Sequence, residues 1–222
     1  MGRYVFPLLM GIAGVALLMS LGFWQLRRME EKRIYLDEIE ARIGNAPIPL
    51  PDMPQEGPHK FQAVFAEGRF TGDTLEVLAG QRGASPGVLV IEAFALPDGR
   101  RIMVQRGFIA EEGRAVPRTV TEARVEGNLH WPQDTNSSTP PPDEKSGLWF
   151  ARDVPAMAAR LQTEPTLIVA SQPTGDGIEP VPVDTSGIPN DHWGYAIQWF
   201  LLAATWAGMT AFLLWRIRNR TV

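Results

Sequence analysis

Two long stretches without a charged residue, one near each end of the chain, constrain the fold most. Tyr4–Leu26 and Trp193–Trp215 each run for 23 residues without Asp, Glu, Lys or Arg. A helix of that length measures roughly 35 Å at about 1.5 Å per residue, which exceeds the roughly 30 Å hydrocarbon core of a bilayer. Because a backbone in lipid must satisfy its own polar groups, we expect two transmembrane helices, at 4–26 and 192–215.

The first stretch indicates a retained anchor and not a signal peptide. Its apolar run is too long, and it leads into Trp24-Gln25-Leu26-Arg27-Arg28 without a small-residue cleavage site. It also begins almost at Met1, which leaves no room for an organelle transit peptide. A bacterial inner membrane is therefore the expected setting.

The basic residues that flank the two helices leave the orientation open. The tail 216–222 carries three arginines and no acid, and Arg3 precedes the first helix, which favours both termini in the cytoplasm. Four basic residues on the other side of the first helix favour the opposite: Arg27, Arg28, Lys32 and Arg33.

The region between the two helices is acidic and contains no cysteine. Residues 27–192 hold all 25 acidic residues and 17 of the 21 basic ones, a net charge of −8. This charge argues against nucleic acid as a partner. The absence of cysteine excludes disulfides and thiolate metal sites.

The same region divides into four segments by pattern. Residues 27–44 alternate in charge sign around apolar positions and predict a solvated helical extension that stops near Gly44. Prolines crowd residues 45–60, which predicts a linker or a loop draped over the domain. Residues 61–173 show short strand patterns between turn signals, with one helix predicted at Val154–Gln162 and capped by Asp153. Residues 174–191 are expected to return the chain to the membrane in extended form.

The fold class that these patterns predict is membrane α plus β. Two transmembrane helices flank a mostly antiparallel β-barrel or sandwich domain with one short helix. Its strands are separated by turn signals at Thr71-Gly72-Asp73, at residues 83–87 and at Pro97-Asp98-Gly99. About 110 residues suffice for one core of this kind.

One pattern matches a hydrolase motif but favours a turn. Gly83-Ala84-Ser85-Pro86-Gly87 fits Gly-x-Ser-x-Gly, whose oxyanion hole needs the backbone N–H after the serine. That residue is Pro86, which has no N–H, and a strand pattern follows it instead of a helix. A membrane-anchored hydrolase using Ser85 stays a rival from another class, and an envelope protein with an adhesion domain is a third.

His192 is the most informative polar residue, because it stands immediately before the second membrane helix. A histidine there suits an axial ligand of haem iron at the lipid edge, or a plain interfacial anchor. Gln25 and Gln198 lie inside the two spans, where polar side chains usually face a partner helix. Arg106, near the end of a predicted strand, suits a carboxylate such as a haem propionate, or plain contact with water.

The second membrane helix also carries a row of small residues. Ala203, Ala207 and Ala211 repeat every four residues, which predicts close approach of another helix. The partner is expected to be the first helix, which offers Ala16 and Ser20, or another membrane protein.

Four motifs in order give the chain its resemblance to a known family. They are Gly22-Phe23-Trp24-Gln25-Leu26-Arg27-Arg28, Val64 to Phe70 with Gly68, Met103-Val104-Gln105-Arg106-Gly107-Phe108-Ile109, and Ile188-Pro189-Asn190-Asp191-His192-Trp193-Gly194-Tyr195-Ala196. Over about residues 15–215 the chain resembles the Surfeit locus protein one family of cytochrome c oxidase assembly factors. It departs from the commoner Asn-Asn-His by having Asp191, and it carries Trp193 where an aliphatic residue is usual.

The resemblance implies a membrane hairpin with both termini in the cytoplasm and the β domain in the periplasm. It implies a non-enzymatic role in delivering or inserting haem a into the catalytic subunit of cytochrome c oxidase, with haem a synthase as a further partner. His192 would then ligate the iron, Trp24, Tyr195 and Trp199 would pack the macrocycle, and Arg106 would face a propionate. The alternative within the family is a membrane scaffold that stabilises an oxidase subunit without binding haem.

Overall fold

The computed structural model describes residues 2–82, 85–119, 121–143, 145–186 and 188–219. The chain forms two compact units. Residues 1–38 and 185–222 make up the first, here called the helical unit, and residues 39–184 make up the second, the β unit. Part of the predicted turn at residues 83–87 lies outside the described residues, at 83 and 84.

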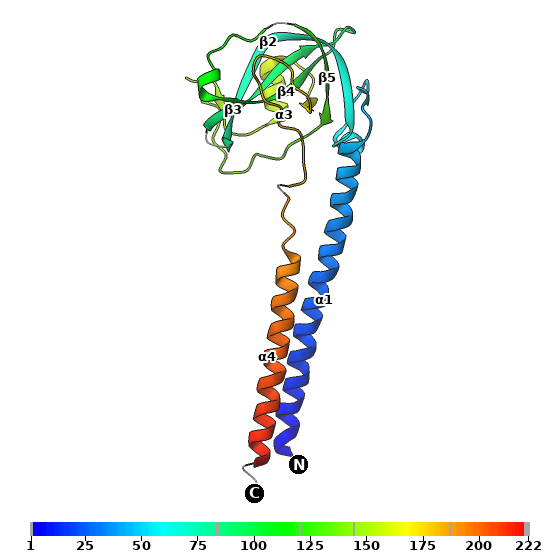
Figure 1. Ribbon diagram of the computed structural model, residues 1–222, viewed down its shortest axis with the longest axis vertical. Coiled ribbons are helices and arrows are strands. Elements are labelled where there is room, and N and C mark those ends of the chain that lie inside the picture. Colours follow the sequence, from blue (N-terminus) through cyan, green and yellow to red (C-terminus); the bar gives the residue numbers. More distant parts are fainter. Residues whose placement is uncertain (1, 83–84, 120, 144, 187, 220–222) are drawn as a thin grey trace. The chain divides into compact units, whose positions relative to one another are not determined.

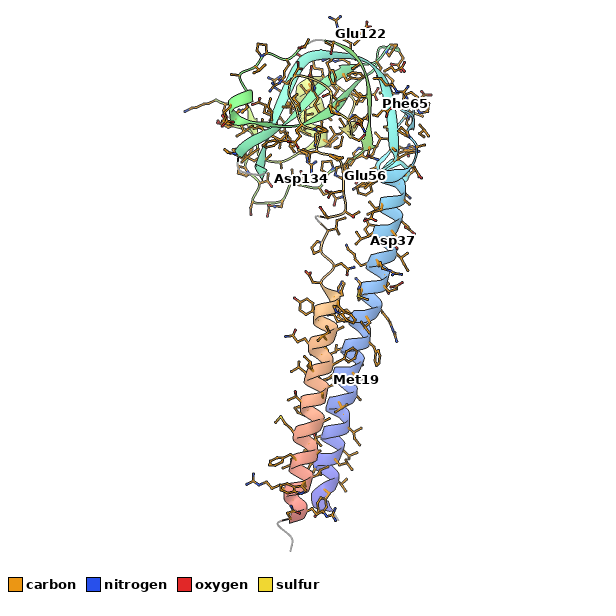
Figure 2. The ribbon with its side chains drawn as sticks, viewed as in Figure 1. Met19, Asp37, Glu56, Phe65, Glu122 and Asp134 are labelled. Atoms are coloured by element: carbon orange, nitrogen blue, oxygen red, sulfur yellow. The ribbon has the colours of Figure 1, made fainter. Side chains whose placement is uncertain are left out.

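Two long helices build the helical unit. α1 spans Gly2–Gly44 and α4 spans His192–Asn219, and they lie side by side in Figure 1. α1 is one continuous helix where the sequence predicts a membrane helix and a helical extension, and its last six residues are grouped with the β unit. Figure 2 labels Met19 in the apolar part of α1 and Asp37 in the charged part.

Both helices are long and apolar enough to cross a membrane. Their most apolar windows have a mean hydropathy of 2.1 in α1 and 1.5 in α4, and only 11% and 6% of those windows are buried. A core helix of a soluble protein would bury such a window against other elements. Here large apolar side chains such as Phe6 and Leu201 point outward, at 72% and 63% exposure. Length and composition therefore favour association with lipid.

Glycines of α1 provide the close approach between the two helices. A Cβ added at any of three glycines would collide with a side chain of α4: Gly11 with Thr210, Gly14 with Trp206 and Gly22 with Phe200. The sequence predicts the small residues of α4 at this contact instead. Ala203 is buried, but Ala207 and Ala211 are exposed, because space on α1 accommodates bulky side chains from α4.

A mixed sheet forms the β unit. Its strands are β1 Ile48–Pro49, β2 Ala63–Arg82, β3 Ser85–Ala95, β4 Arg101–Ala110, β5 Glu122–Leu129, β6 Leu148–Trp149 and β7 Leu167–Ala170. β2 pairs antiparallel with both β3 and β5, and β3 pairs antiparallel with β4. β7 runs parallel to β4 and antiparallel to β5. The predicted antiparallel barrel or sandwich therefore fits only loosely, because the helical crossover before β7 permits a parallel pair.

One predicted turn is a bulge inside a long strand. The chain passes through Thr71-Gly72-Asp73 without reversing, and the pairing of β2 with β3 shifts register between Phe70 and Thr74. Gly72 has φ of +84°, which suits glycine, and its N–H donates to Oε1 of Glu92 at 2.9 Å. Turn residues in this position bend the strand instead of ending it.

The proline-rich segment 45–60 lies along the β unit. Within it, β1 pairs parallel with β2, and α2 covers Glu56–His59. The backbone N–H of Leu50 donates to the carbonyl of Phe65 at 2.9 Å. The segment is therefore a loop draped on the domain, one of the two alternatives that the sequence leaves open.

The two faces of the sheet bury separate apolar clusters. On β4, Ile102 and Val104 enter one cluster and Met103 enters the other, as the two-residue period of a strand requires. The helix α3, Val154–Leu161, covers the cluster around Met103. Asp153 caps this helix by accepting from the N–H of Ala156 at 3.1 Å, which confirms the predicted cap.

A buried guanidinium joins two strands to the segment that follows the sheet. Arg106 is 1% exposed, and its ring-stacking partner Phe70 lies 4.4 Å from its Cζ. Its nitrogens contact Glu92 Oε2 at 2.7 Å, Asp176 Oδ2 at 2.8 Å, Thr174 Oγ1 at 2.9 Å and the Thr174 carbonyl at 2.8 Å. The arginine therefore holds β3, β4 and residues 174–176 together.

The pKa values of Glu92 and Asp176, the two carboxylates of this network, shift in opposite directions. Burial raises the pKa of Glu92, although hydrogen bonds from Arg106 and the N–H of Gly72 favour its charged form. Burial acts in the same direction on Asp176, but hydrogen bonds from Thr119 and Arg106 outweigh it and hold the pKa of Asp176 below its ordinary value. Both groups depend on Arg106 for compensation of their burial.

The network predicts a large loss of stability on removal of its cation. Arg106→Met should lower the free energy of unfolding by about 3–5 kcal/mol, because Glu92 would keep its burial without its counter-charge. Urea unfolding of the full chain in detergent, followed by near-ultraviolet circular dichroism, measures this. The matched control is Arg124→Met, which removes an arginine 48% exposed and paired with Glu67, and should cost at most about 1 kcal/mol. Equal losses in the two variants would contradict the prediction.

Candidate functional site

The three histidines of the chain have different surroundings. His59 belongs to α2, and its Nδ1 accepts a hydrogen bond from the backbone N–H of Gln55 at 2.9 Å. His130 follows β5 inside the β unit. His192 is the first residue of α4 and lies in the helical unit. His192 differs from the other two histidines in two ways. Its ring contacts a side chain of another helix, and exposed aromatic residues such as Tyr195 follow it on α4.

His130 is a half-buried histidine whose pKa lies below its ordinary value. Its Nδ1 is buried without a hydrogen-bond partner among the described residues, and its ring lies 5.3 Å from that of Phe61. Burial lowers its pKa to about 4, with help from the charges of Arg152 and Lys60 and against those of Asp134 and Glu56. It lies in the β unit, at the end of β5.

His192 meets a glutamine from the other helix. Its Nδ1 lies 2.8 Å from Oε1 of Gln25, a residue 167 positions earlier in the sequence. Both side chains are half-buried. No other hydrogen bond to the ring of His192 is found among the described residues, so Nε2 stays available. Gln198, the other glutamine predicted to connect the helices, is exposed.

The packing next to this contact fixes the position of α4 along the axis of α1. Gly22 is buried and contacts Phe200, and the ring of Phe23 meets the ring of Phe200 edge-on at 5.4 Å. Ala196, one turn after His192, is 1% exposed. Gln25 lies almost one turn after Gly22 on α1, so the polar contact is the continuation of an apolar seam.

The aromatic residues predicted around His192 are only partly brought to it. Tyr195 and Trp199 follow at three and seven positions, so they share a face of α4 with the histidine. Tyr195 is 54% exposed and Trp199 is half-buried. Trp24 is 52% exposed and lies about 100° around α1 from Gln25, so it does not share the direction of the Gln25 side chain.

A second polar group near His192 lacks a partner. Oδ1 of Asn190 is buried without a hydrogen bond among the described residues, two positions before the histidine. Leaving a buried acceptor unpaired costs about 1–3 kcal/mol, which a ligand or an ordered water would relieve. The approach to α4 therefore has unused hydrogen-bonding capacity.

Arg106 lies in the β unit, whereas His192 lies in the helical unit. The sequence predicts that its guanidinium binds a carboxylate, and it does, but the carboxylates are those of Glu92 and Asp176 inside the β unit. With its nitrogens engaged and only 1% of its side chain exposed, it has no free face for a haem propionate. The correction follows from burial, which requires an arginine to find its counter-charges within the fold.

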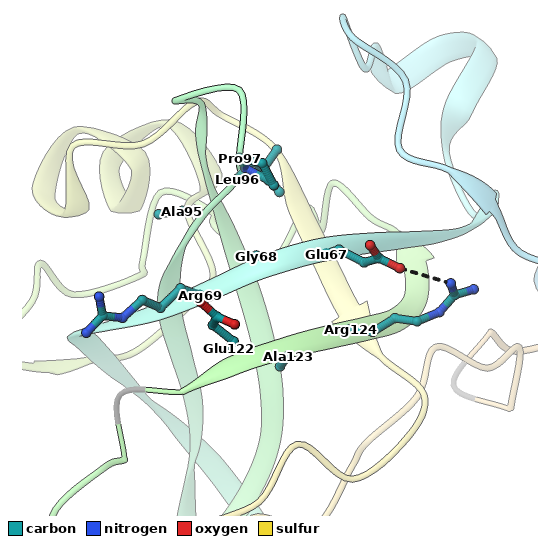
Figure 3. Close-up of a pocket in the computed structure, with 9 residues that line it drawn as sticks. All are labelled: Glu67, Gly68, Arg69, Ala95, Leu96, Pro97, Glu122, Ala123 and Arg124. Atoms are coloured by element: carbon teal, nitrogen blue, oxygen red, sulfur yellow. Dashed lines mark hydrogen bonds and ion pairs between the residues drawn. The ribbon is translucent and has the colours of Figure 1, made fainter.

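A surface cavity of about 680 Å³ lies where β2, β3 and β5 of the β unit meet (Figure 3). Its charged lining is internally balanced, because Glu67 pairs with Arg124 at 3.2 Å and Arg69 lies opposite Glu122 in the strand pairing. A separate groove of about 490 Å³ lies between α1 and α4, lined by apolar side chains and Arg216. Neither contains a histidine.

The described residues contain no group of three or more His, Asp or Glu side chains arranged to hold a metal ion.

Sequence reasoning identified His192 and Gln25 separately but not their contact. The signal was present in the sequence, because Gln25 lies near the last residue of the first predicted span and His192 lies at the first residue of the second. Antiparallel helices place the last turns of one beside the first turns of the other, which would have paired them. What the sequence lacks is the rotation of each helix, which the glycine contacts of α1 set.

Comparisons with known proteins show similarity over most of the chain. The model of the SURF1 family matches residues 12–204. A SURF1-like protein of Monosiga brevicollis is 29% identical, over 91% of this chain and 85% of its own length. A SURF1-like protein of Rickettsia felis is 27% identical, over 84% and 87%. The Surfeit locus protein 1 of Rattus norvegicus is 28% identical, over 83% of this chain and 68% of its own length.

The burial of His130 predicts a loss of stability in mild acid. As the pH falls from about 6.5 toward about 4, the unfolded chain binds a proton at this position that the folded chain does not. The free energy of unfolding should fall by about 2 kcal/mol across that window, and His130→Phe should flatten the loss. Urea titrations at pH 7, 6 and 5 measure it, with His59→Gln as the control. An unchanged pH dependence in His130→Phe would contradict the assignment.

Proposed function

Because the chain belongs to the SURF1 family, we propose that it is a membrane-anchored assembly factor for haem-copper cytochrome c oxidase. In this proposal it is not an enzyme but a carrier, which accepts haem a and delivers it to the catalytic subunit of the oxidase. A haem a synthase would supply the cargo. The observation that carries the proposal is His192, a histidine at the start of an apolar helix with one ring nitrogen held by Gln25 and the other free.

The residues around His192 fit a haem as cargo. The iron needs an axial donor, and neutral imidazole is a common one. The porphyrin needs apolar and aromatic surface, which Tyr195 and Trp199 offer on the face of α4 that carries His192. Trp24, exposed on α1, would complete the aromatic surroundings at the level of the lipid headgroups. The apolar surfaces of α1 and α4 would contact the hydrophobic edge of the haem within the bilayer.

The proposed topology places both termini in the cytoplasm of a bacterial inner membrane and the β unit in the periplasm. Two helices that both pass the length and hydropathy test bring the chain back to its starting side. Arg216 and Arg218 in the last turn of α4 support a cytoplasmic end. The site at His192 would then lie at the outer edge of the membrane.

A carrier needs a bond that forms and breaks readily. One axial histidine leaves the opposite face of the iron open to the acceptor, so transfer can begin before the first ligand leaves. The half-exposed position of His192 suits such an exchange, whereas a fully buried ligand would have to wait for the helices to separate. The geometry therefore favours transient holding over permanent binding.

A second candidate function is a scaffold that stabilises an oxidase subunit and never binds haem. The observation that favours it is the open cavity of about 680 Å³ on the β unit, lined by charged residues of both signs and by Leu96 and Pro97. A segment of a partner protein could occupy such a surface. The two candidates differ in whether His192 is needed.

The test is the visible absorption spectrum of the full chain purified in detergent from cells that make haem a. We expect a haem a band in the wild type that is lost or shifted in His192→Ala, because the iron loses its axial donor. His59→Ala is the matched control and should keep the wild-type band, since Nδ1 of His59 accepts a hydrogen bond from the backbone N–H of Gln55 at the start of α2. Near-ultraviolet circular dichroism checks that both variants fold.

Two outcomes would count against the carrier. The first is a folded wild type that carries no haem despite active haem a synthesis. The second is a His192→Ala variant with an unchanged band and normal oxidase assembly. Either result would leave the scaffold as the better account of this chain.

A further inference from the structure

The contact between Gln25 and His192 defines which nitrogen of the histidine can bind iron. We propose that Gln25 is a positioning residue: its carboxamide oxygen holds His192 in the tautomer with the proton on Nδ1 and thereby presents the lone pair of Nε2 to the cargo. This inference rests on the proposed function. It assigns to a residue of α1 a role in the chemistry of a residue of α4.

The argument begins with the 2.8 Å separation between Oε1 of Gln25 and Nδ1 of His192. A carboxamide oxygen has lone pairs and no hydrogen, so it accepts only. A hydrogen bond of this length therefore requires the proton on Nδ1 of His192. In a neutral imidazole the other nitrogen, Nε2, then carries the lone pair that a metal needs.

The same contact also limits the orientation of the ring. A ligating histidine usually donates its second ring N–H to a neighbouring acceptor, which fixes the tautomer and the direction of the metal-binding nitrogen. Here the acceptor comes from the opposite helix, and the close approach of Gly22 to Phe200 sets its position. Without Gln25 the ring would be free to rotate and to carry its proton on Nε2, where it blocks ligation.

The choice of an amide over a carboxylate matters for a carrier. A carboxylate acceptor pulls the Nδ1 proton more strongly and makes the imidazole a more basic ligand, which tightens its bond to a metal. A neutral amide orients the ring without placing a negative charge beside it. The pair therefore combines a fixed geometry with a bond to iron of moderate strength, which suits cargo that must leave.

The experiment compares three substitutions in the full chain purified with haem a in detergent. Gln25→Leu keeps the approximate volume and removes the acceptor, while Gln25→Glu replaces the amide with a carboxylate. Gln198→Leu is the matched control, because Gln198 is an exposed glutamine on α4. Three readouts are taken on each variant: the rate of haem loss to excess apomyoglobin, the reduction potential of the bound haem, and its visible spectrum.

We expect Gln25→Leu to lose haem about 10–100-fold faster than the wild type, the usual effect of removing such a partner from a metal ligand. Gln25→Glu should restore retention to the wild-type level or beyond. It should also shift the reduction potential downward, because a more anionic imidazole stabilises ferric iron. Gln198→Leu should match the wild type in all three readouts.

The outcomes separate this inference from the function on which it rests. If His192→Ala keeps its haem, the proposed function fails, and the role of Gln25 fails with it. If His192→Ala loses haem while Gln25→Leu keeps the wild-type rate and potential, the function stands and the positioning role is overturned. If Gln25→Leu and Gln25→Glu lose haem equally, Gln25 contributes only packing, and the tautomer argument is wrong.

Discussion

The β unit depends on one cation that water cannot reach. A guanidinium buried to 1% exposure must find all its hydrogen-bond acceptors within the protein, and Arg106 takes them from β3 and from residues 174–176. Each acceptor in turn is held by another segment: Glu92 by the bulge at Gly72, and Asp176 by Thr119. The bulge in β2, the pairing of β3 with β4 and the course of the segment after β7 are thus parts of one electrostatic arrangement.

The parts of the fold that the sequence predicted are those that local chemistry decides. Uncharged runs of 23 residues predicted the two long helices, and the Asp153 cap with its following apolar pattern predicted α3. The turn predicted at Thr71-Gly72-Asp73 is a bulge, because the same residue types form both structures. The buried carboxylate of Glu92, which accepts from Gly72, lies 20 residues away in the sequence. The parallel pairing of β7 with β4 is likewise set by distant strands.

The candidate site shows the same division. His192 was predicted from its place before an apolar helix, but its partner needs the packing of two helices that are separated by the whole β unit. Arg106 was assigned to an external ligand because sequence cannot show whether a strand-end arginine is buried. Tyr195 and Trp199 share a face of α4 with His192, and Trp24 is exposed on α1, so their joint contact with a haem stays a prediction. Local sequence patterns therefore identified His192 and Arg106 as candidate binding residues, whereas their contacts with Gln25 and Glu92 depend on packing between distant segments.

Gln25 and His192 lie 167 positions apart, which has a consequence for how the site comes into being. A chain is made from its N-terminus, so Gln25 is synthesised long before His192. The whole β unit must be synthesised before the second helix can join the first. A chain stopped at any earlier point would carry Gln25 without the histidine that it orients. Cargo would thus be accepted only by molecules whose synthesis is finished, with no separate inspection step.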